Sequence, residues 1–225
     1  MWKLTAGNKS LQKREGTAAV DAPQQTALDA AGRKELAKQE ALTGYIYLLV
    51  DSSASMRKGN KLKQAQKGAI QFAKNAFKQG YYTGMIQFAT SPTVVCEPGK
   101  DLKMLEKAIS TISAGKSTHM AKAIRLAHTL LAGQPGMRVI VVVTDGLPNG
   151  EGDPQASVAA AEAARNAGIY IMAIGTDDAD IDFLKRLASR FDLGMKIERN
   201  QLASAIVDSS RMLPPPQNKL AKTSY

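Results

Sequence analysis

Residues 45–55 read Tyr-Ile-Tyr-Leu-Leu-Val-Asp-Ser-Ser-Ala-Ser, and the expected fold follows from this stretch. An uninterrupted apolar and β-prone run ends at Asp51, which is typical of a strand buried on both faces of a parallel sheet. Asp51, Ser53 and Ser55 alternate with two other residues, so an extended or tightly turned backbone would point their oxygens towards one place. Oxygen ligands of this kind suit Mg²⁺ or another hard divalent cation.

The length of 225 residues fits one sizeable α/β domain with tails better than two domains. We expect an N-terminal arm over residues 1–44, a folded domain over 45–213 and a proline-rich basic tail over 214–225. Frequent Ala, Gln, Lys and Glu predict a helix in the arm, within residues 23–42. Three prolines at 214–216 stop the last helix of the domain.

The formal net charge of +10 raises the question of nucleic-acid binding. Residues 1–44 carry seven basic against five acidic side chains, and residues 214–225 carry two lysines and no acid, which leaves +6 for the domain between them. Most of the positive charge therefore lies in the domain and not in a detachable basic tail. With few aromatic residues and no recognised nucleic-acid motif, it favours a solvated, lysine-rich surface, and we expect no nucleic-acid partner.

The expected compartment is the cytoplasm. Cys96 is the single cysteine, so an internal disulfide is excluded and a reducing environment fits best. No stretch approaches the ~20 apolar residues that span a bilayer, and the first residues lack the apolar core of a signal peptide. We expect a soluble protein with no membrane contact.

Strand-like runs alternate with helix-like patterns along the domain. Apolar residues spaced by three and four over 62–76 predict an amphipathic helix that Asn60 caps. Residues 139–143 form a second continuous apolar strand, and the short link between strands at 84–89 and 93–96 predicts an antiparallel pair. The expected fold is an α/β, doubly wound, mostly parallel six-stranded sheet with one antiparallel edge strand and helices on both faces.

Sheets of this type bind ligands at the carboxyl ends of their strands. Asp51 and Asp145 both follow apolar strands and are expected at that edge, and Thr118 lies in a loop that opens a helix. Taken alone, each residue has an ordinary structural interpretation: Thr118 as a helix cap, and Asp145 with Gly146 as a turn pair. Their occurrence together, in this order, favours a common site.

This pattern of Asp-x-Ser-x-Ser, a second-loop Thr and a third-loop Thr-Asp-Gly resembles the von Willebrand factor type A domain, also called the integrin I-like domain. The resemblance runs from about residue 45 to residue 213, in element order as well as motif. It implies a Rossmann-like fold and a metal-ion-dependent adhesion site. The positions of that site are all filled here, by Asp51, Ser53, Ser55, Thr118 and Asp145.

The resemblance also implies a role for each residue. Ser53 and Ser55 would coordinate the metal directly, Thr118 directly or through water, and Asp51 and Asp145 through bridging water or as switchable ligands. Neutral hydroxyls hold the ion without quenching its charge, so Mg²⁺, or Mn²⁺ or Ca²⁺ in its place, keeps an open position for a partner carboxylate. A basic rim would favour an acidic partner surface, and its expected members are Arg57, Lys58, Lys61, Lys116 and His119.

The predicted function is a non-enzymatic, metal-dependent protein-interaction module that binds an Asp or Glu of a partner within a multi-protein intracellular assembly. By analogy with small proteins of this family, an ATPase of the AAA+ class is a candidate partner. Two alternatives stay open. One is a structural, self-associating subunit with a structural metal. The other is a hydrolase using Ser53 or Ser55 with His119 as base, which the missing Gly-x-Ser-x-Gly elbow disfavours.

Overall fold

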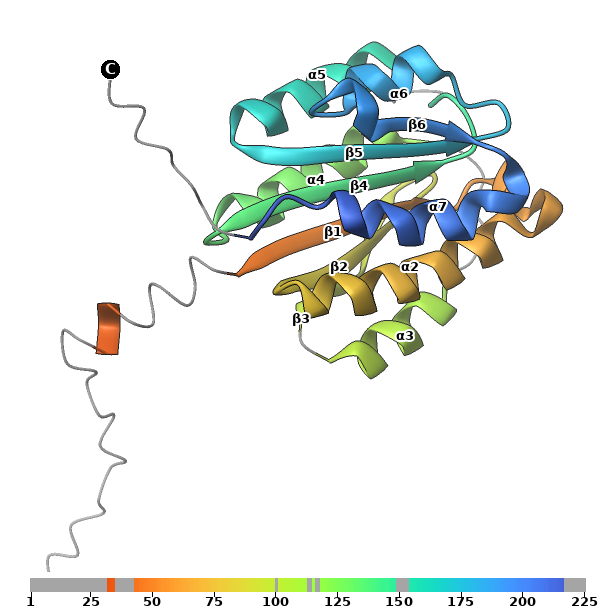
Figure 1. Ribbon diagram of the computed structural model, residues 1–225. Helices are drawn as coiled ribbons and strands as arrows, with labels where there is room; N and C mark the ends of the chain where they lie inside the picture. Colours follow the sequence, from red (N-terminus) through yellow and green to blue (C-terminus); the bar gives the residue numbers. More distant parts are fainter. Residues whose placement is uncertain are drawn as a thin grey trace, which may run out of the picture.

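The computed structural model describes residues 32–34, 43–99, 101–112, 115, 118–148 and 154–216. A six-stranded sheet with the order β3-β2-β1-β4-β5-β6 forms its centre (Figure 1). The strands are β1 (Gly44–Asp51), β2 (Tyr81–Phe88), β3 (Pro92–Gly99), β4 (Met137–Thr144), β5 (Ile169–Thr176) and β6 (Gly194–Ile197). The α-helices are α2 (Lys61–Lys78), α3 (Leu102–Ser110), α4 (Met120–Ala132), α5 (Pro154–Asn166), α6 (Ile181–Leu187) and α7 (Leu202–Ser209).

All neighbouring strands pair in parallel except β2 and β3, which are antiparallel. β3 is also an edge strand, so the predicted six-stranded, mostly parallel sheet with one antiparallel edge strand is confirmed. The short link from Phe88 to Pro92 explains this arrangement, because a parallel return needs a crossover of a dozen or more residues.

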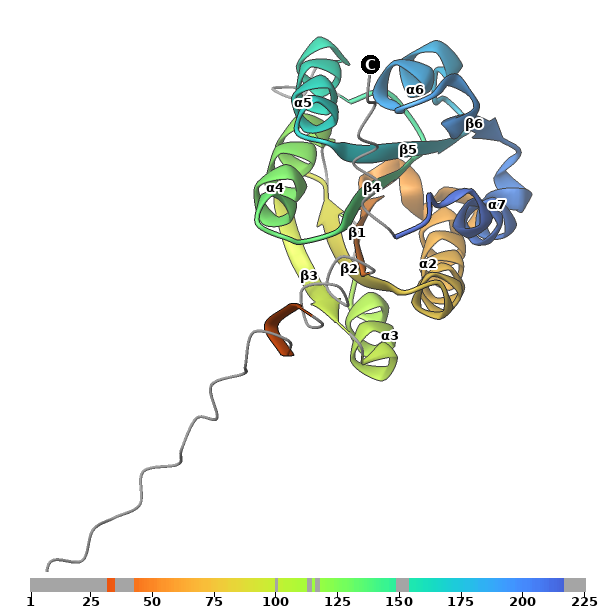
Figure 2. The ribbon, with the colours of Figure 1, turned by 60° about the vertical axis from the view of Figure 1, so that its left-hand side comes forward.

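Two hydrophobic layers cover the two faces of the sheet, and alternation along β1 supplies both. Ile46, Leu48 and Val50 point into the layer that α2, α3 and α7 cover. Tyr47 and Leu49 point into the layer that α4, α5 and α6 cover. Figure 2 shows α4 and α5 on one side of the sheet and α2, α3 and α7 on the other. The central strands are buried on both faces, as their continuous apolar sequences predict.

The carboxyl ends of the parallel strands lie along one edge of the sheet, and their amino ends lie along the opposite edge. The arrowheads of the parallel strands point to the edge where the 3-10 helix η1 (Ala54–Asn60) lies (Figure 1). At the other edge, the backbone N–H of Met137 donates to Thr43, and the Tyr81 hydroxyl donates to the carbonyl of Pro214 at 2.5 Å. The described body therefore begins and ends away from the edge that carries Asp51.

Asn60 does precede α2, but it adopts the left-handed conformation with φ 58° and its side chain makes no cap hydrogen bond. The predicted capping interaction is therefore wrong, because η1 leads directly into α2 and the turn at Gly59 and Asn60 redirects the chain. Of the helix predicted within residues 23–42, residues 32–34 are helical and the rest lies outside the described residues.

The packing of α2 against α7 gives a testable prediction. A Cβ on Gly68 would lie 2.9 Å from the carbonyl oxygen of Ala203 and 3.0 Å from the Cβ of Ile206. We expect Gly68→Ala to lower the free energy of unfolding by about 1–2 kcal/mol through overpacking, although alanine gains about 1 kcal/mol over glycine inside a helix. Urea denaturation measures this change. Gly133→Ala is the control, because a Cβ there meets nothing within 4 Å; equal stability of the two variants would contradict the close packing.

Candidate metal site

The loop after β1 turns its side chains in two directions. The backbone N–H and the hydroxyl of Ser52 both donate to the carbonyl of Phe88, at 2.9 and 3.3 Å, and fix the loop to β2. The backbone N–H of Ser53 donates to Asp51 Oδ1 at 2.8 Å, which closes a tight turn. Ser52 is thereby held against β2, whereas the Asp51 side chain, at the end of β1, accepts from the loop backbone at Ser53.

Two serine hydroxyls and a carboxylate oxygen from the loop after β4 form a continuous chain of hydrogen bonds. Ser53 Oγ lies 2.9 Å from Ser55 Oγ, and Ser55 Oγ donates to Asp145 Oδ1 at 2.8 Å. Ser53 and Asp145 are buried, whereas Ser55 is exposed, so the chain of oxygens opens to solvent at Ser55. The structure thus brings together residues that are 90 positions apart in sequence.

Asp51 is 1% exposed and both of its carboxylate oxygens are engaged. Oδ1 accepts from Ser53, and Oδ2 accepts from the hydroxyl of Thr144 at 2.7 Å. The pKa of Asp51 is raised to about 6, because burial, together with the nearby charge of Asp145, outweighs the lowering effect of the hydrogen bonds from Ser53 and Thr144. Thr144 was not predicted as a site residue, because a threonine at the end of an apolar strand is an ordinary strand residue.

The loop that contains Thr118 is hydrogen-bonded to the first loop. Gly115 donates its backbone N–H to the carbonyl of Ser52 at 2.5 Å, and His119 donates its own to Ala89 at 2.9 Å. A side chain at Gly115 would lie 2.5 Å from the Cβ of Ala89, so this close approach requires glycine. Thr118 is buried in the same loop, next to α4. Lys116, predicted on the rim, lies outside the described residues.

Among the described residues, His119 makes no contact with a serine hydroxyl. Its Nδ1 atom is buried and has no hydrogen-bond partner there, whereas the hydroxyls of Ser53 and Ser55 bond to each other and to Asp145. Nucleophilic catalysis needs a base within hydrogen-bond reach of the hydroxyl. The geometry therefore offers no support to the hydrolase alternative.

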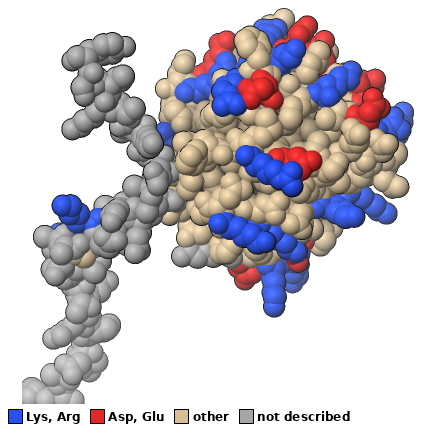
Figure 3. Space-filling view, in the orientation of Figure 1, with Lys and Arg blue, Asp and Glu red and all other residues tan. Residues whose placement is uncertain are grey.

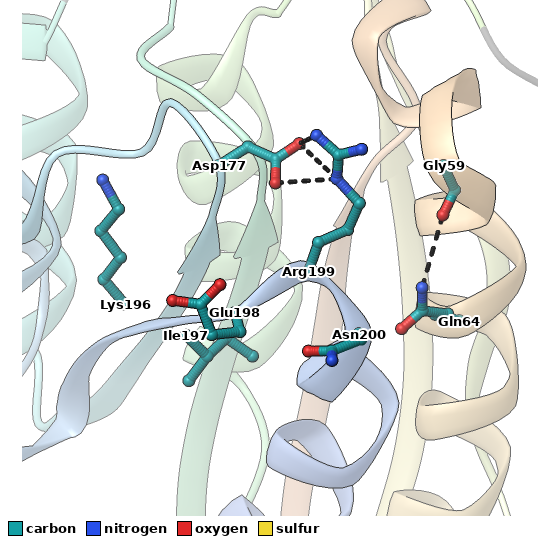
Figure 4. A pocket seen from close by; sticks show the side chains of 8 residues that line it. All are labelled: Gly59, Gln64, Asp177, Lys196, Ile197, Glu198, Arg199 and Asn200. Carbon is teal, nitrogen blue, oxygen red and sulfur yellow. Dashed lines mark hydrogen bonds and ion pairs between the residues drawn. The ribbon is translucent and has the colours of Figure 1, made fainter.

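Behind Asp145 lies a network of charges that the sequence did not reveal. The ammonium of Lys61 contacts Asp145 Oδ2 and lies 2.7 Å from Asp177 Oδ2. Arg199 approaches Asp177 with Nε 3.0 Å from both carboxylate oxygens, as Figure 4 shows, and with a second nitrogen at 2.8 Å. Asp177 follows β5 in the left-handed conformation, with φ 50°. Its hydrogen bond with Arg199 and the Lys61 charge lower its pKa to about 2.

Lys61 differs from its predicted place on the basic rim. It is 3% exposed, because the first turn of α2 directs its side chain between two carboxylates rather than into solvent. Burial lowers the pKa of Lys61, but the contacts with Asp145 and Asp177 outweigh this and raise it. Arg57 and Lys58 are exposed, as predicted for the rim. On the face drawn in Figure 3, basic and acidic side chains are interspersed rather than gathered in one basic area.

The donor set fits a hard divalent cation. Within hydrogen-bond distance of one another lie two hydroxyls and one carboxylate oxygen, and a second carboxylate braces the loop. Among the described residues, no three His, Cys, Asp or Glu side chains gather in a manner that would hold a metal. A site here would therefore depend on hydroxyl oxygens, which favour Mg²⁺-like ions over the softer metals that prefer sulfur or nitrogen.

The chain belongs to the von Willebrand factor type A domain family, whose model matches residues 46–204. The order of the elements and the doubly wound sheet agree with this assignment. A comparison with curated proteins found no match. In the described residues, no helix is long and apolar enough to cross a membrane.

Several solved structures share the fold at low sequence identity. The vWF domain of the type V pili tip protein Mfa5 from Porphyromonas gingivalis superposes with a TM-score of 0.69 at 14% identity, covering 76% of this chain and 95% of that one. Proximal thread matrix protein 1 from the mussel byssus, with a zinc-occupied MIDAS motif, gives 0.63 at 17% identity, over 77% and 46%. An aerotolerance-related membrane protein from Bacteroides fragilis gives 0.59 at 21% identity, over 75% and 99%.

The ion pairs of Asp177 give a pH prediction. Because its folded-state pKa of about 2 lies below the ordinary carboxyl value, its contribution to stability is complete above pH 4 and is lost as the pH falls towards 2. We expect Asp177→Asn to destabilise the protein at pH 5, and its difference from wild type to shrink by pH 2.5. Urea unfolding across this range measures both effects. Asp182→Asn, at an exposed position of α6, is the control. A difference that stays constant with pH would contradict the assigned ion pairs.

Proposed function

We propose that this chain is a divalent-metal-dependent protein-interaction module that captures an Asp or Glu side chain of a partner. The observation that carries this proposal is the chain of hydrogen-bonded oxygens from Ser53 through Ser55 to Asp145 at the carboxyl edge of the sheet. It opens to solvent at Ser55, where a partner has access. The proposal is supported by the family and by the metal-occupied motif of the similar byssus protein.

Each residue has a distinct role in the proposed site, which is a metal-ion-dependent adhesion site. Ser53 and Ser55 would hold the ion through their hydroxyls, with Thr118 contributing directly or through water. Asp51 has both oxygens engaged by Ser53 and Thr144, which suits an indirect role in orienting the loop and balancing charge. When bound, the ion supplies an electrophilic position at which a partner carboxylate can replace water.

We propose Mg²⁺ as the ion, with Mn²⁺ and Ca²⁺ as alternatives, because the ligands are all oxygens. Around the site, Arg57 and Lys58 are exposed on η1 and would attract an acidic surface. Leu147 is 44% exposed and only two residues after Asp145, so it would offer a partner an apolar contact near the site. The partner surface that fits is therefore a carboxylate with an apolar neighbour and acidic surroundings.

The setting of this interaction remains the sequence-based proposal: an intracellular, multi-protein assembly in which an ATPase of the AAA+ class is one candidate. The similar structures come from a pilus tip protein, a byssus matrix protein and a membrane protein, so they favour no single compartment. Self-association through the same site is the alternative. Mass measurement of the purified chain with Mg²⁺ and with chelator distinguishes them, since only self-association raises the mass without another protein.

Removal of the ligands should abolish metal binding. We expect neither Asp51→Ala nor the double variant Ser53→Ala with Ser55→Ala to bind Mg²⁺ or Mn²⁺ in calorimetric titration, while circular dichroism shows a folded protein. Ser52→Ala is the matched control, because the Ser52 hydroxyl bonds to Phe88 and points away from the oxygen chain. Unchanged metal affinity in the ligand variants would sink the metal assignment.

Charge reversal on the rim should weaken partner capture without changing metal affinity. We expect Lys58→Glu to reduce the protein retained from an extract in Mg²⁺, and the effect to fade at high salt as screening increases. Lys78→Glu makes the same charge change at the last residue of α2, a helix of 18 residues and about 27 Å that begins next to the rim. Equal losses for both variants would mean that net charge, and not the rim, drives capture.

A further inference from the structure

The two carboxylate oxygens of Asp145 have different partners. Oδ1 accepts from the hydroxyl of Ser55, at the end of the oxygen chain proposed to hold the metal. Oδ2 contacts the ammonium of Lys61. One oxygen therefore faces the metal position, whereas the other is held from behind by a cation that belongs to the protein itself.

The position of Lys61 is costly for a positive charge. Its side chain is 4% exposed, so the ammonium is largely shielded from water. It is also the first residue of α2, where the partial positive charge of the helix dipole disfavours a cation. Asp145 and Asp177, on two different strand ends, offset both costs. Arg199 pairs with Asp177 in turn. We call Lys61, Asp177 and Arg199 the charge row.

A count of formal charges shows what this row does to the site. Asp51 and Asp145 alone carry two negative charges, which a divalent ion would neutralise. With Lys61, Asp177 and Arg199 included, the cluster carries one negative charge, so the same ion leaves one positive charge in excess. The row thus weakens the attraction for the ion and strengthens the attraction of the loaded site for a carboxylate.

We propose that Lys61 is a positioning residue that tunes the metal site, a role that rests on the proposed metal-dependent function. It fixes the Asp145 carboxylate with Oδ1 towards Ser55 and opposes the ion with its own charge. The ion is therefore held loosely enough to exchange and stays electrophilic enough to bind an acidic partner. Asp177, supported by Arg199, keeps the ammonium of Lys61 in place.

Mn²⁺ titration of the full chain by calorimetry at pH 7.5 tests this role through two variants with opposite expectations. Lys61→Met removes the opposing charge and should tighten Mn²⁺ binding by roughly tenfold or more. Asp177→Asn removes a negative charge and leaves Lys61 to Asp145 alone, so it should weaken binding several-fold. Lys63→Met, an exposed position on the same helix, is the control and should stay within about twofold.

The signs of these changes decide the outcome. A purely structural role for the row predicts that both variants loosen Asp145 and weaken binding, and that result, or unchanged affinity in Lys61→Met, overturns the proposal. If Lys61→Met does not fold, Arg199→Met takes its place, because it also removes a positive charge from the cluster: it should tighten Mn²⁺ binding, and weaker or unchanged binding overturns the proposal. Asp51→Ala separates failure of the proposed metal site from failure of the proposed tuning by Lys61. Equal Mn²⁺ binding by wild type and Asp51→Ala refutes the metal site itself, whereas loss in Asp51→Ala with no gain in Lys61→Met refutes only the tuning.

Discussion

The burial of two carboxylates at the carboxyl edge of the sheet is the constraint on which the site depends. Asp51 and Asp145 are 1% and 3% exposed, and a buried charge is tolerated only where donors or opposite charges surround it. Those partners come from distant parts of the chain: Thr144 for Asp51, and Ser55 and Lys61 for Asp145. The loops around the site bring these donors and charges to the buried carboxylates.

The doubly wound topology makes this convergence possible. β1, β4 and β5 are adjacent and parallel, so their carboxyl ends lie together: Asp51 is the last residue of β1, and Asp145 and Asp177 are the first residues after β4 and β5. The backbone N–H of Asp178 donates to the carbonyl of Asp145 at 3.1 Å, which joins the last two loops directly. The fold thus places three acids side by side. Asp51 and Asp145 belong to the proposed metal site, and Asp177 holds the ammonium of Lys61.

The fold and the convergence of Ser53, Ser55 and Asp145 could be predicted from the sequence, but the ion pairs of Lys61 could not. Continuous apolar strands that end in acids predicted both the sheet and the edge at which Asp51 and Asp145 meet. Helical periodicity placed Lys61 off the apolar face of α2, which predicted that its side chain faces solvent. Its actual partners lie 84 and 116 residues away, and pairing over such distances leaves no local pattern. The acids that follow β5 were the one available signal, because they repeat the strand-then-acid pattern of the other two loops.

The proposed function requires that the oxygen chain of Ser53, Ser55 and Asp145 holds a divalent ion. The most direct measurement is the anomalous scattering of manganese in crystals of the full chain soaked in MnCl₂. We expect one peak bonded to the hydroxyls of Ser53 and Ser55, on the Oδ1 side of Asp145, with the Lys61 ammonium still on the Oδ2 side. A peak elsewhere, or none at this edge, would contradict it.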